Sequence, residues 1–351
     1  MDNLLTMHRF TTQGWLVCAM AAFSASTLLM PVWQPNPLAG ALAVGLLMAL
    51  GFARWKTPRS LTGIHGRWIL PASVHALDEV TVGAALVAGE NAPPLALQAW
   101  QPMRRRFEIV ARFSGLNPQP TQAWWTASFP KRGRVLLPAL VVETTQPFGL
   151  LSARIPVGAG FELVVFPALG QIRREFEIRI QRWLEMHSLG RDNGEDELAY
   201  LREYRPGDHP HSIHWKASAR RRSMQVIERH ALGCRRLALV VDTTAGAHAW
   251  KFERLLSAAA TLVDYFFGKG WTLTLHGHFA PEGMEAGREQ LLETLALAEA
   301  QSGDISRVIP EHQASVVVML NPLDASGFAP HALVLTLAEC EAIVLVPSRV
   351  R

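Results

Sequence analysis

Residues 200–226 read YLREYRPGDHPHSIHWKASARRRSMQV, which places three histidines, an aspartate and a run of arginines in one short segment. His209, His211 and His214 could bind zinc, and Asp208 with His214 could act as an acid–base pair. A zinc site needs a third or fourth well-spaced ligand, and in an extended chain His209 and His211 share a face that His214 does not. No serine or cysteine nucleophile motif accompanies them, so solvated or structural histidines are the expectation and catalysis is the alternative.

The basic residues of the same segment could contact phosphates. Nucleic-acid binding normally shows a larger excess of charge on one face with interleaved aromatic residues, and the net charge of the chain is only +4. A solvated face with ion pairs to Glu197, Asp208 and Glu228 explains the run from Arg220 to Arg222 better than nucleic-acid binding does. We therefore expect no nucleic-acid partner, while an acidic protein partner remains open.

A docking loop fits the segment better. Pro206 to Asp208 is a turn signal, because glycine adopts left-handed backbone angles cheaply and aspartate accepts backbone N–H bonds. Ile213 and Trp215 lie two residues apart, which predicts that both are buried on one side of an extended strand. Lys216 and Arg220 then remain available for the carboxylates of a partner.

The first sixty residues predict a membrane anchor, which would decide the compartment of residues 200–226. No charged residue occurs between Arg9 and Arg54, and two apolar runs, 14–30 and 38–55, are each near the length of a membrane-spanning helix. We predict a transmembrane helical hairpin over residues 1–60, with a cleaved signal peptide as the alternative. Positive charge flanks the hairpin at Arg9, Arg54 and Lys56, so both of its ends should face the cytoplasm.

The cysteine content agrees with that compartment. The chain has three cysteines, at 18, 234 and 340, with no C-x-x-C spacing. This pattern is typical of a reducing environment and excludes a disulfide scaffold or a cysteine zinc site.

Short strands separated by Pro, Gly and Asn follow the anchor, which predicts a β-sandwich over residues 61–168. In RFEIVARF, residues 106–113, the apolar residues Phe107, Ile109, Ala111 and Phe113 alternate with more polar ones. That period of two predicts that these four side chains share the half-buried face of a strand.

Residues 169–351 change period. A helix is predicted over 170–186 from Ile172, Phe176, Ile180 and Leu184 at four-residue spacing. Continuous apolar strands then alternate with helices near 251–267 and 288–300, which indicates a parallel sheet and a Rossmann-like α/β domain. No glycine-rich phosphate-binding motif opens any of these helices, so we expect no nucleotide cofactor.

The segment of residues 194–230 resembles the bacterial family known as domain of unknown function 58. The matching positions are Glu197, Leu201, Arg202, Tyr204, Gly207, Asp208, Ile213, Trp215, Lys216, Ser218, Ala219 and Arg220. The sequence Pro-Phe-Gly-Leu at residues 147–150 and the two N-terminal helices are similar to that family as well. We expect this segment to fasten the α/β domain and to dock a partner through Glu197, Arg202, Tyr204, Gly207, Asp208, Trp215, Lys216 and Arg220.

The resemblance implies that the C-terminal domain is similar to a von Willebrand factor A domain, in which Asp-x-Ser-x-Ser after the first strand helps to bind a divalent ion. Here the positions read Asp242-Thr243-Thr244-Ala245-Gly246. Asp242 and the Thr244 hydroxyl could supply two oxygen ligands for Mg²⁺, but Gly246 has none to offer. A metal-free loop is the expectation, and a metal site is the alternative.

Proteins of this kind are often encoded beside MoxR-type AAA+ ATPases. The resemblance thus implies a non-enzymatic interaction or assembly module, tethered to the bacterial inner membrane by several passes and working with such an ATPase in the cytoplasm. The alternative is a metal-dependent hydrolase centred on Asp242 or on Asp208 and His214.

Overall fold

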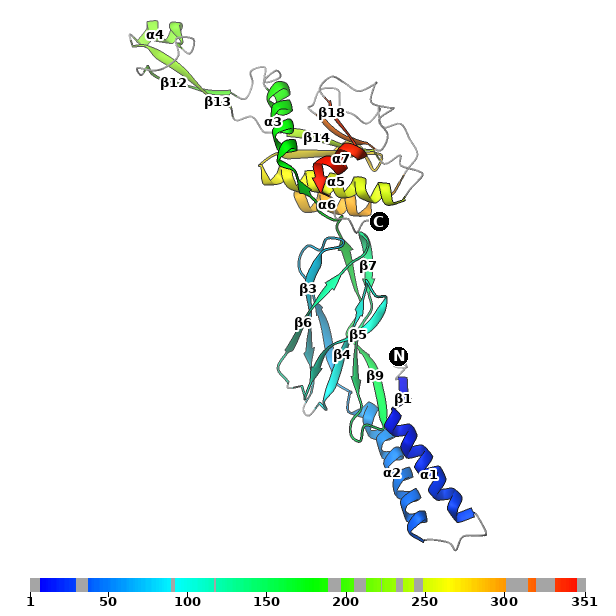
Figure 1. Cartoon of the computed structure of the whole chain (residues 1–351). Helices are drawn as coiled ribbons and strands as arrows, with labels where there is room; N and C mark the ends of the chain where they lie inside the picture. The colour runs from blue at the N-terminus through cyan, green and yellow to red at the C-terminus, as the bar shows by residue number, and fades with distance from the viewer. Residues whose placement is uncertain are drawn as a thin grey trace. The chain divides into compact units, whose positions relative to one another are not determined.

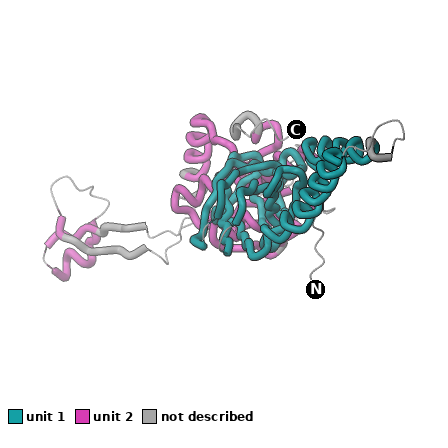
Figure 2. Tube along the Cα trace, turned by 90° about the horizontal axis from the view of Figure 1, so that it is seen from below, with its two compact units in different colours: residues 1–166 teal, residues 167–351 magenta. Residues whose placement is uncertain are grey.

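The structure, a computed structural model, describes residues 7–29, 37–89, 92–116, 118–188, 197–204, 213–221, 223–231, 236–242, 249–300, 315–319 and 332–345. The chain is a mixed α/β protein with several antiparallel sheets. It divides into two compact units, Met1–Phe166 and Pro167–Arg351 (Figure 2).

Two helices near the N-terminus agree closely with the predicted apolar runs. α1 spans Thr12–Leu29, α2 spans Pro37–Arg59, and the two pack against each other (Figure 1). The Thr11 hydroxyl accepts a hydrogen bond of 3.0 Å from the Gly14 N–H and so caps α1. Pro37 occupies the first position of α2, where its missing N–H costs nothing. Among the described residues, α2 is the helix that is long and apolar enough to cross a membrane.

A short strand precedes α1. β1, Met7–Phe10, pairs antiparallel with β9, Leu151–Val157, so that Phe10 lies opposite Leu151. The prediction for residues 1–60 places helices at about 14–30 and 38–55 and does not include this strand before them. Four residues are too few to show a period of two, and the strand that pairs with them lies far along the chain.

The chain enters α1 against the loop Pro147–Leu150. The Thr11 N–H donates to the Leu150 carbonyl oxygen at 3.1 Å, and the Thr11 hydroxyl donates to the Gly149 carbonyl oxygen at 2.5 Å. A Cβ at position 14 would overlap the Leu150 carbonyl oxygen, so Gly14 lets the first turn of α1 approach this backbone closely. The loop therefore fastens α1 to the strands that follow the helices.

Three antiparallel sheets form the rest of the first unit, here called the β domain (residues 65–166). Their strand orders are β1-β9-β8-β4-β5, β2-β3-β6 and β10-β7. The strands are β2 His65–Ile69, β3 Glu79–Val87, β4 Leu95–Gln101, β5 Arg106–Phe113, β6 Thr121–Ser128, β7 Gly133–Leu137, β8 Leu140–Thr144 and β10 Phe161–Val165. Leu86, Leu97, Leu140, Val142 and Ala153 lie in one buried core that joins the two larger sheets.

A bulge changes which side of β5 faces this core. The register between β4 and β5 shifts by one residue at Val110, and such an insertion moves the side chains beyond it to the other face. Val110, Ala111 and Phe113 pack against the core, whereas Phe107 and Ile109 are exposed. The predicted burial is confirmed for Ala111 and Phe113 and is wrong for Phe107 and Ile109.

A five-stranded sheet with the order β16-β15-β14-β17-β18 organises the second unit. β14, β15, β17 and β18 pair in parallel, and β16 is antiparallel to β15. The strands are β14 Arg236–Val241, β15 Thr272–Gly277, β16 Ala280–Glu285, β17 Ser315–Met319 and β18 Ala332–Thr336. A second, two-stranded sheet pairs β11, Gln171–Ile172, with β19, Val344–Leu345.

Helices accompany this sheet. They are α3 Arg174–Ser188, α5 Ala249–Gly268, α6 Arg288–Leu297 and α7 Leu337–Ile343, and α5 contacts β14, β15 and β17 (Figure 1). The predicted apolar face of α3 is confirmed at Phe176, Ile180 and Leu184, which are buried, while Ile172 lies before the helix in β11. The side chains of Leu255 and Phe266 are fully buried in α5, as their spacing predicts.

Tyr265 connects α5 to α3. Burial raises the pKa of its phenol above the ordinary value, and the nearby Glu177 carboxylate raises it further through its charge and a hydrogen bond. The Lys269 ammonium lies 3.8 Å from Glu177 and 5.5 Å from the centroid of the Tyr265 ring.

This environment predicts an alkaline loss of stability. A raised pKa in the folded state favours the neutral phenol, so its contribution is complete below the ordinary pKa of about 10 and is lost as pH rises through the raised value. Tyr265→Phe should flatten the fall of the denaturation midpoint in that range, because phenylalanine cannot ionise. Parallel midpoint curves for the variant and the wild type would contradict this.

Candidate interaction site

The segment that matches the family pattern forms a small module of two strands and a helix. β12, Glu197–Glu203, pairs antiparallel with β13, Gln225–Ala231, and α4 spans Trp215–Arg221 (Figure 1). We call this group of elements the motif module. The predicted turn at Gly207 and Asp208 lies outside the described residues, as do His209 and His211.

The motif module brings the two halves of the pattern together. Arg202 of β12 lies opposite Val226, and Ile213 forms an isolated bridge to the same residue. The Tyr204 N–H donates to the Met224 carbonyl oxygen at 2.8 Å. Residues 224–226 therefore lie between residues 202–204 and residue 213. The N-terminal half of the pattern, which ends at Tyr204, and the C-terminal half, which begins at Ile213, are thus close together.

Trp215 differs from its prediction. It is the first residue of α4 rather than part of an extended strand, and its side chain is 66% exposed. A helix turns about 100° per residue, so the period of two that placed Trp215 beside Ile213 does not apply. Ile213 itself is half-buried. The burial of Trp215 as an anchor is thus wrong, and its indole is free for contact with another molecule.

His214 caps α4. Its Nδ1 accepts a hydrogen bond of 3.0 Å from the Ala217 N–H, and its carbonyl oxygen accepts one of 3.0 Å from the Ser218 N–H. The first bond satisfies one of the N–H groups that a helix leaves unpaired at its start, and the second is the first backbone bond of the helix itself. A structural role for His214 explains the residue without zinc and without proton transfer.

Ser218 fastens α4 to β13. Its hydroxyl donates to the His214 carbonyl oxygen at 3.0 Å and accepts from the Gln225 N–H at 2.8 Å. Gln225 is almost fully buried, with 2% of its surface exposed. The hydroxyl thus satisfies a backbone donor that water does not easily reach.

Ser218→Ala should therefore loosen the motif module while leaving both units folded. It leaves the buried Gln225 N–H unpaired, which costs about 1–3 kcal/mol. We expect faster hydrogen exchange in α4 and at the start of β13, measured by mass spectrometry. Ser218→Thr is the matched control, since threonine keeps a hydroxyl at this position that can accept from the Gln225 N–H. Equal exchange in the two variants would contradict this role for Ser218.

Exposed aromatic and basic side chains cover the end of the motif module. Trp215, Lys216 and Arg220 are exposed on α4, and Tyr204 is exposed beside Met224. Met224 was missed from the sequence, because a single apolar residue before a strand carries no periodic signal. Glu197 and Arg202 have described backbones in β12, and their side chains lie outside what is described.

Asp242 lies at the carboxyl end of the central strand β14. It is buried, and its N–H donates to the Val318 carbonyl oxygen at 2.9 Å. Thr244 and Gly246 lie outside the described residues. Within the described part of the chain, no three His, Cys, Asp or Glu side chains form a group that could hold a metal ion.

Comparisons with known proteins do not identify a family for this chain. Models of protein families do not match the chain, and a search of curated proteins finds no match. The family resemblance therefore depends on the residues of the motif module and of the loop Pro147–Leu150.

Proposed function

We propose that the chain is a membrane-tethered interaction module of the domain of unknown function 58 family, and that it works with a MoxR-type AAA+ ATPase in the bacterial cytoplasm. The motif module is its docking surface. The observation that carries this proposal is the exposure of Trp215 beside Lys216 at the start of a capped helix. Tryptophan is enriched among the residues that dominate binding energy, and here it stands beside exposed basic residues.

The charge of the motif module indicates the chemistry of the partner. Lys216, Arg220 and Arg221 are exposed on α4, and the helix contains no carboxylate. An acidic surface with an apolar recess for the indole would complement this arrangement. The ATPase itself follows from the family resemblance rather than from geometry.

The pairing of β1 with β9 supports a two-helix anchor. β1 precedes α1, and β9 follows α2, yet both lie in one sheet. If α2 crosses the bilayer, α1 has to cross it as well, because β1 and β9 pair and therefore lie on the same side of the membrane. Arg9 precedes α1, and Arg54 and Lys56 lie near the end of α2, which favours the cytoplasmic side of the inner membrane.

The second unit is proposed to be Rossmann-like, of the von Willebrand factor A type. Its support is the parallel order β15-β14-β17-β18, with α5 between β14 and β15 and α6 between β16 and β17. In such sheets ligands bind beyond the carboxyl ends of the strands, where Asp242 lies. Asp242 is buried there, which fits a residue that fixes the loop after β14 in place.

Co-purification tests the proposed function. The full-length chain, solubilised from membranes in detergent, should retain a purified MoxR-type ATPase of the same organism, and retention should weaken as salt concentration rises. Lys216→Glu should reduce it, whereas Arg134→Glu, which changes the same charge on β7 of the β domain, should not. Absence of retention by the wild-type chain, or equal loss in both variants, would contradict the proposal.

A further inference from the structure

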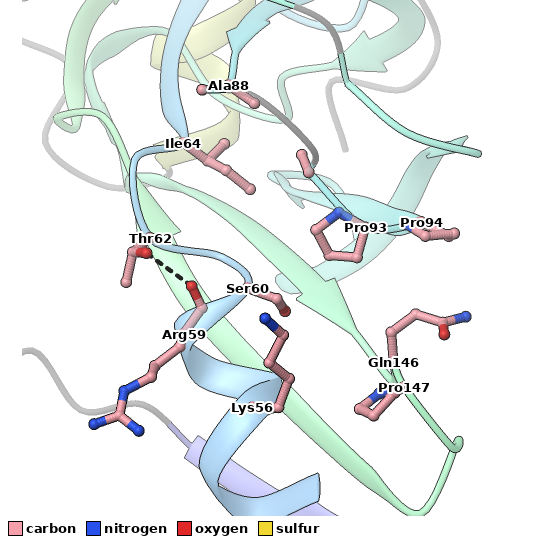
Figure 3. A pocket seen from close by; sticks show the side chains of 12 residues that line it. Lys56, Arg59, Ser60, Thr62, Ile64, Ala88, Pro93, Pro94, Gln146 and Pro147 are labelled. Atoms are coloured by element: carbon pink, nitrogen blue, oxygen red, sulfur yellow. Dashed lines mark hydrogen bonds between the residues drawn. The ribbon is translucent and has the colours of Figure 1, made fainter. Parts of the chain in front are cut away.

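A pocket of about 420 Å³ opens at the C-terminal end of α2, within the first unit (Figure 3). Lys56 and Ser60 line one side of it, and Pro93 and Pro147 come from loops of the β domain on the other. Ile64 contributes an apolar wall. The pocket therefore combines apolar surface with a single lysine at the end of the proposed membrane helix.

Lys56 and Arg59 are the two basic residues that line this pocket, and their side chains point in different directions. Figure 3 shows the Lys56 ammonium group beside Ser60, on the pocket side, while the Arg59 side chain turns away. The Arg59 guanidinium instead lies 4.6 Å from the centroid of the Trp55 ring. Within the described part of the chain, the Lys56 ammonium has no acceptor and no lining residue is acidic. Glu90, which borders the lining residues in sequence, lies outside the described residues.

The negative end of the α2 dipole does not oppose an anion here. Free carbonyl groups at a helix C-terminus carry partial negative charge, but these are satisfied. The Lys56 carbonyl oxygen accepts from the Ser60 N–H at 3.0 Å, and the Thr57 carbonyl oxygen accepts from the Ser60 hydroxyl at 2.7 Å. The Thr62 hydroxyl donates to the Arg59 carbonyl oxygen at 2.7 Å, as the dashed line in Figure 3 marks.

Exposed aromatic residues surround the ends of the helices that lie next to the β domain. Trp15 is near the start of α1, Phe52 and Trp55 are near the end of α2, and Phe148 lies in the adjoining loop. The Phe52 ring centroid lies 5.9 Å from that of Phe148 and 6.0 Å from that of Trp55. Tryptophan favours the interface between bilayer and water, so these residues indicate the level of the lipid headgroups.

We propose that this pocket binds the phosphodiester headgroup of an anionic phospholipid from the leaflet in which α2 ends. The Lys56 ammonium pairs with the phosphate, and the proline and isoleucine walls contact the first methylene groups of the acyl chains. A free phosphate ion would leave those walls uncovered, which is why the lipid is the chosen ligand. The inference rests on the membrane anchor proposed above and deepens it, because it gives the anchor a lipid preference.

Native mass spectrometry of the full-length chain in detergent, with equimolar phosphatidylglycerol and phosphatidylcholine, tests the pocket. The wild type should retain phosphatidylglycerol preferentially. Lys56→Gln should weaken that retention about fivefold, the effect expected of one cation near an anionic lipid. Arg54→Gln is the matched control, because it removes the same charge from the same end of α2 without lining the pocket. Ala92→Met, which narrows the pocket and keeps every charge, should also weaken retention.

Three results would overturn the inference. They are equal retention of the two lipids by the wild type, equal losses in Lys56→Gln and Arg54→Gln, and displacement of phosphatidylglycerol by inorganic phosphate, which indicates a site for free anions. A thermal unfolding midpoint of Lys56→Gln equal to that of the wild type would show that the variant is folded. A separate measurement, insertion of the wild type into vesicles of phosphatidylcholine alone, tests the anchor. If the chain inserts and shows no lipid preference, the pocket assignment fails and the anchor stands.

Discussion

Gly158→Ala is expected to destabilise the β domain by about 3 kcal/mol or more, whereas Gly63→Ala should cost only about 1 kcal/mol. Both glycines have positive φ angles, 76° at Gly158 and 80° at Gly63, so any other residue strains the backbone at either position. They differ in their surroundings. A Cβ at Gly63 meets nothing within 4 Å, but a Cβ at Gly158 would overlap the carbonyl oxygen of Gly66 in β2.

The Gly158 contact joins the two larger sheets of the β domain. Gly66 belongs to β2 of the three-stranded sheet, and Gly158 directly follows β9 of the five-stranded one. Because both partners are backbone, no side-chain rotation can relieve the overlap, and one strand has to move. Hydrogen exchange of the amides in β2 and β9 reports the free energy of local opening, and so measures how far each variant is destabilised. Equal protection in the two variants would show that backbone strain alone decides the effect.

Helical periodicity made the long elements predictable. The apolar face of α3 and that of α5 repeat over several turns, and α2 is an unbroken apolar run, so each carries its own burial pattern in its sequence. Parallel pairing was predictable for the same reason, since fully buried strands such as β14 are apolar on both faces. In these elements local pattern and tertiary environment agree.

Shorter elements depend on partners that the local sequence does not reveal. β1 exists because β9 offers it an edge, and the face of β5 is set by one extra residue at Val110. Trp215 was assigned to a strand because Ile213 lies two residues before it. The cap at His214 and the anchor at Ser218 start a helix there instead, and the second of these depends on Gln225 of β13. The exposure of Trp215 could therefore not be predicted from the spacing of the two residues.

The direction of Trp215 leads to a sharper test of docking. Trp215→Ala with Lys216→Glu should weaken binding of the full-length chain to a purified MoxR-type ATPase about 30-fold or more, since truncating a dominant interface residue costs about 2 kcal/mol or more. Stability should hardly change, because the indole contributes little burial and the cap at His214 remains. Surface plasmon resonance with the chain in lipid nanodiscs measures the affinity, and circular dichroism confirms the fold.

The second unit contains a matched control for this pair. Trp250 and Lys251 form the same dipeptide in the first turn of α5, and the Trp250 side chain is 42% exposed. Trp250→Ala with Lys251→Glu makes the same two substitutions in the helix that follows Asp242. This is the edge at which a von Willebrand factor A-like domain would bind a partner. Retained binding in this variant, with loss in the Trp215 variant, assigns docking to the motif module. The reverse result assigns it to the carboxyl ends of the parallel strands, and α4 then serves only to close the hairpin.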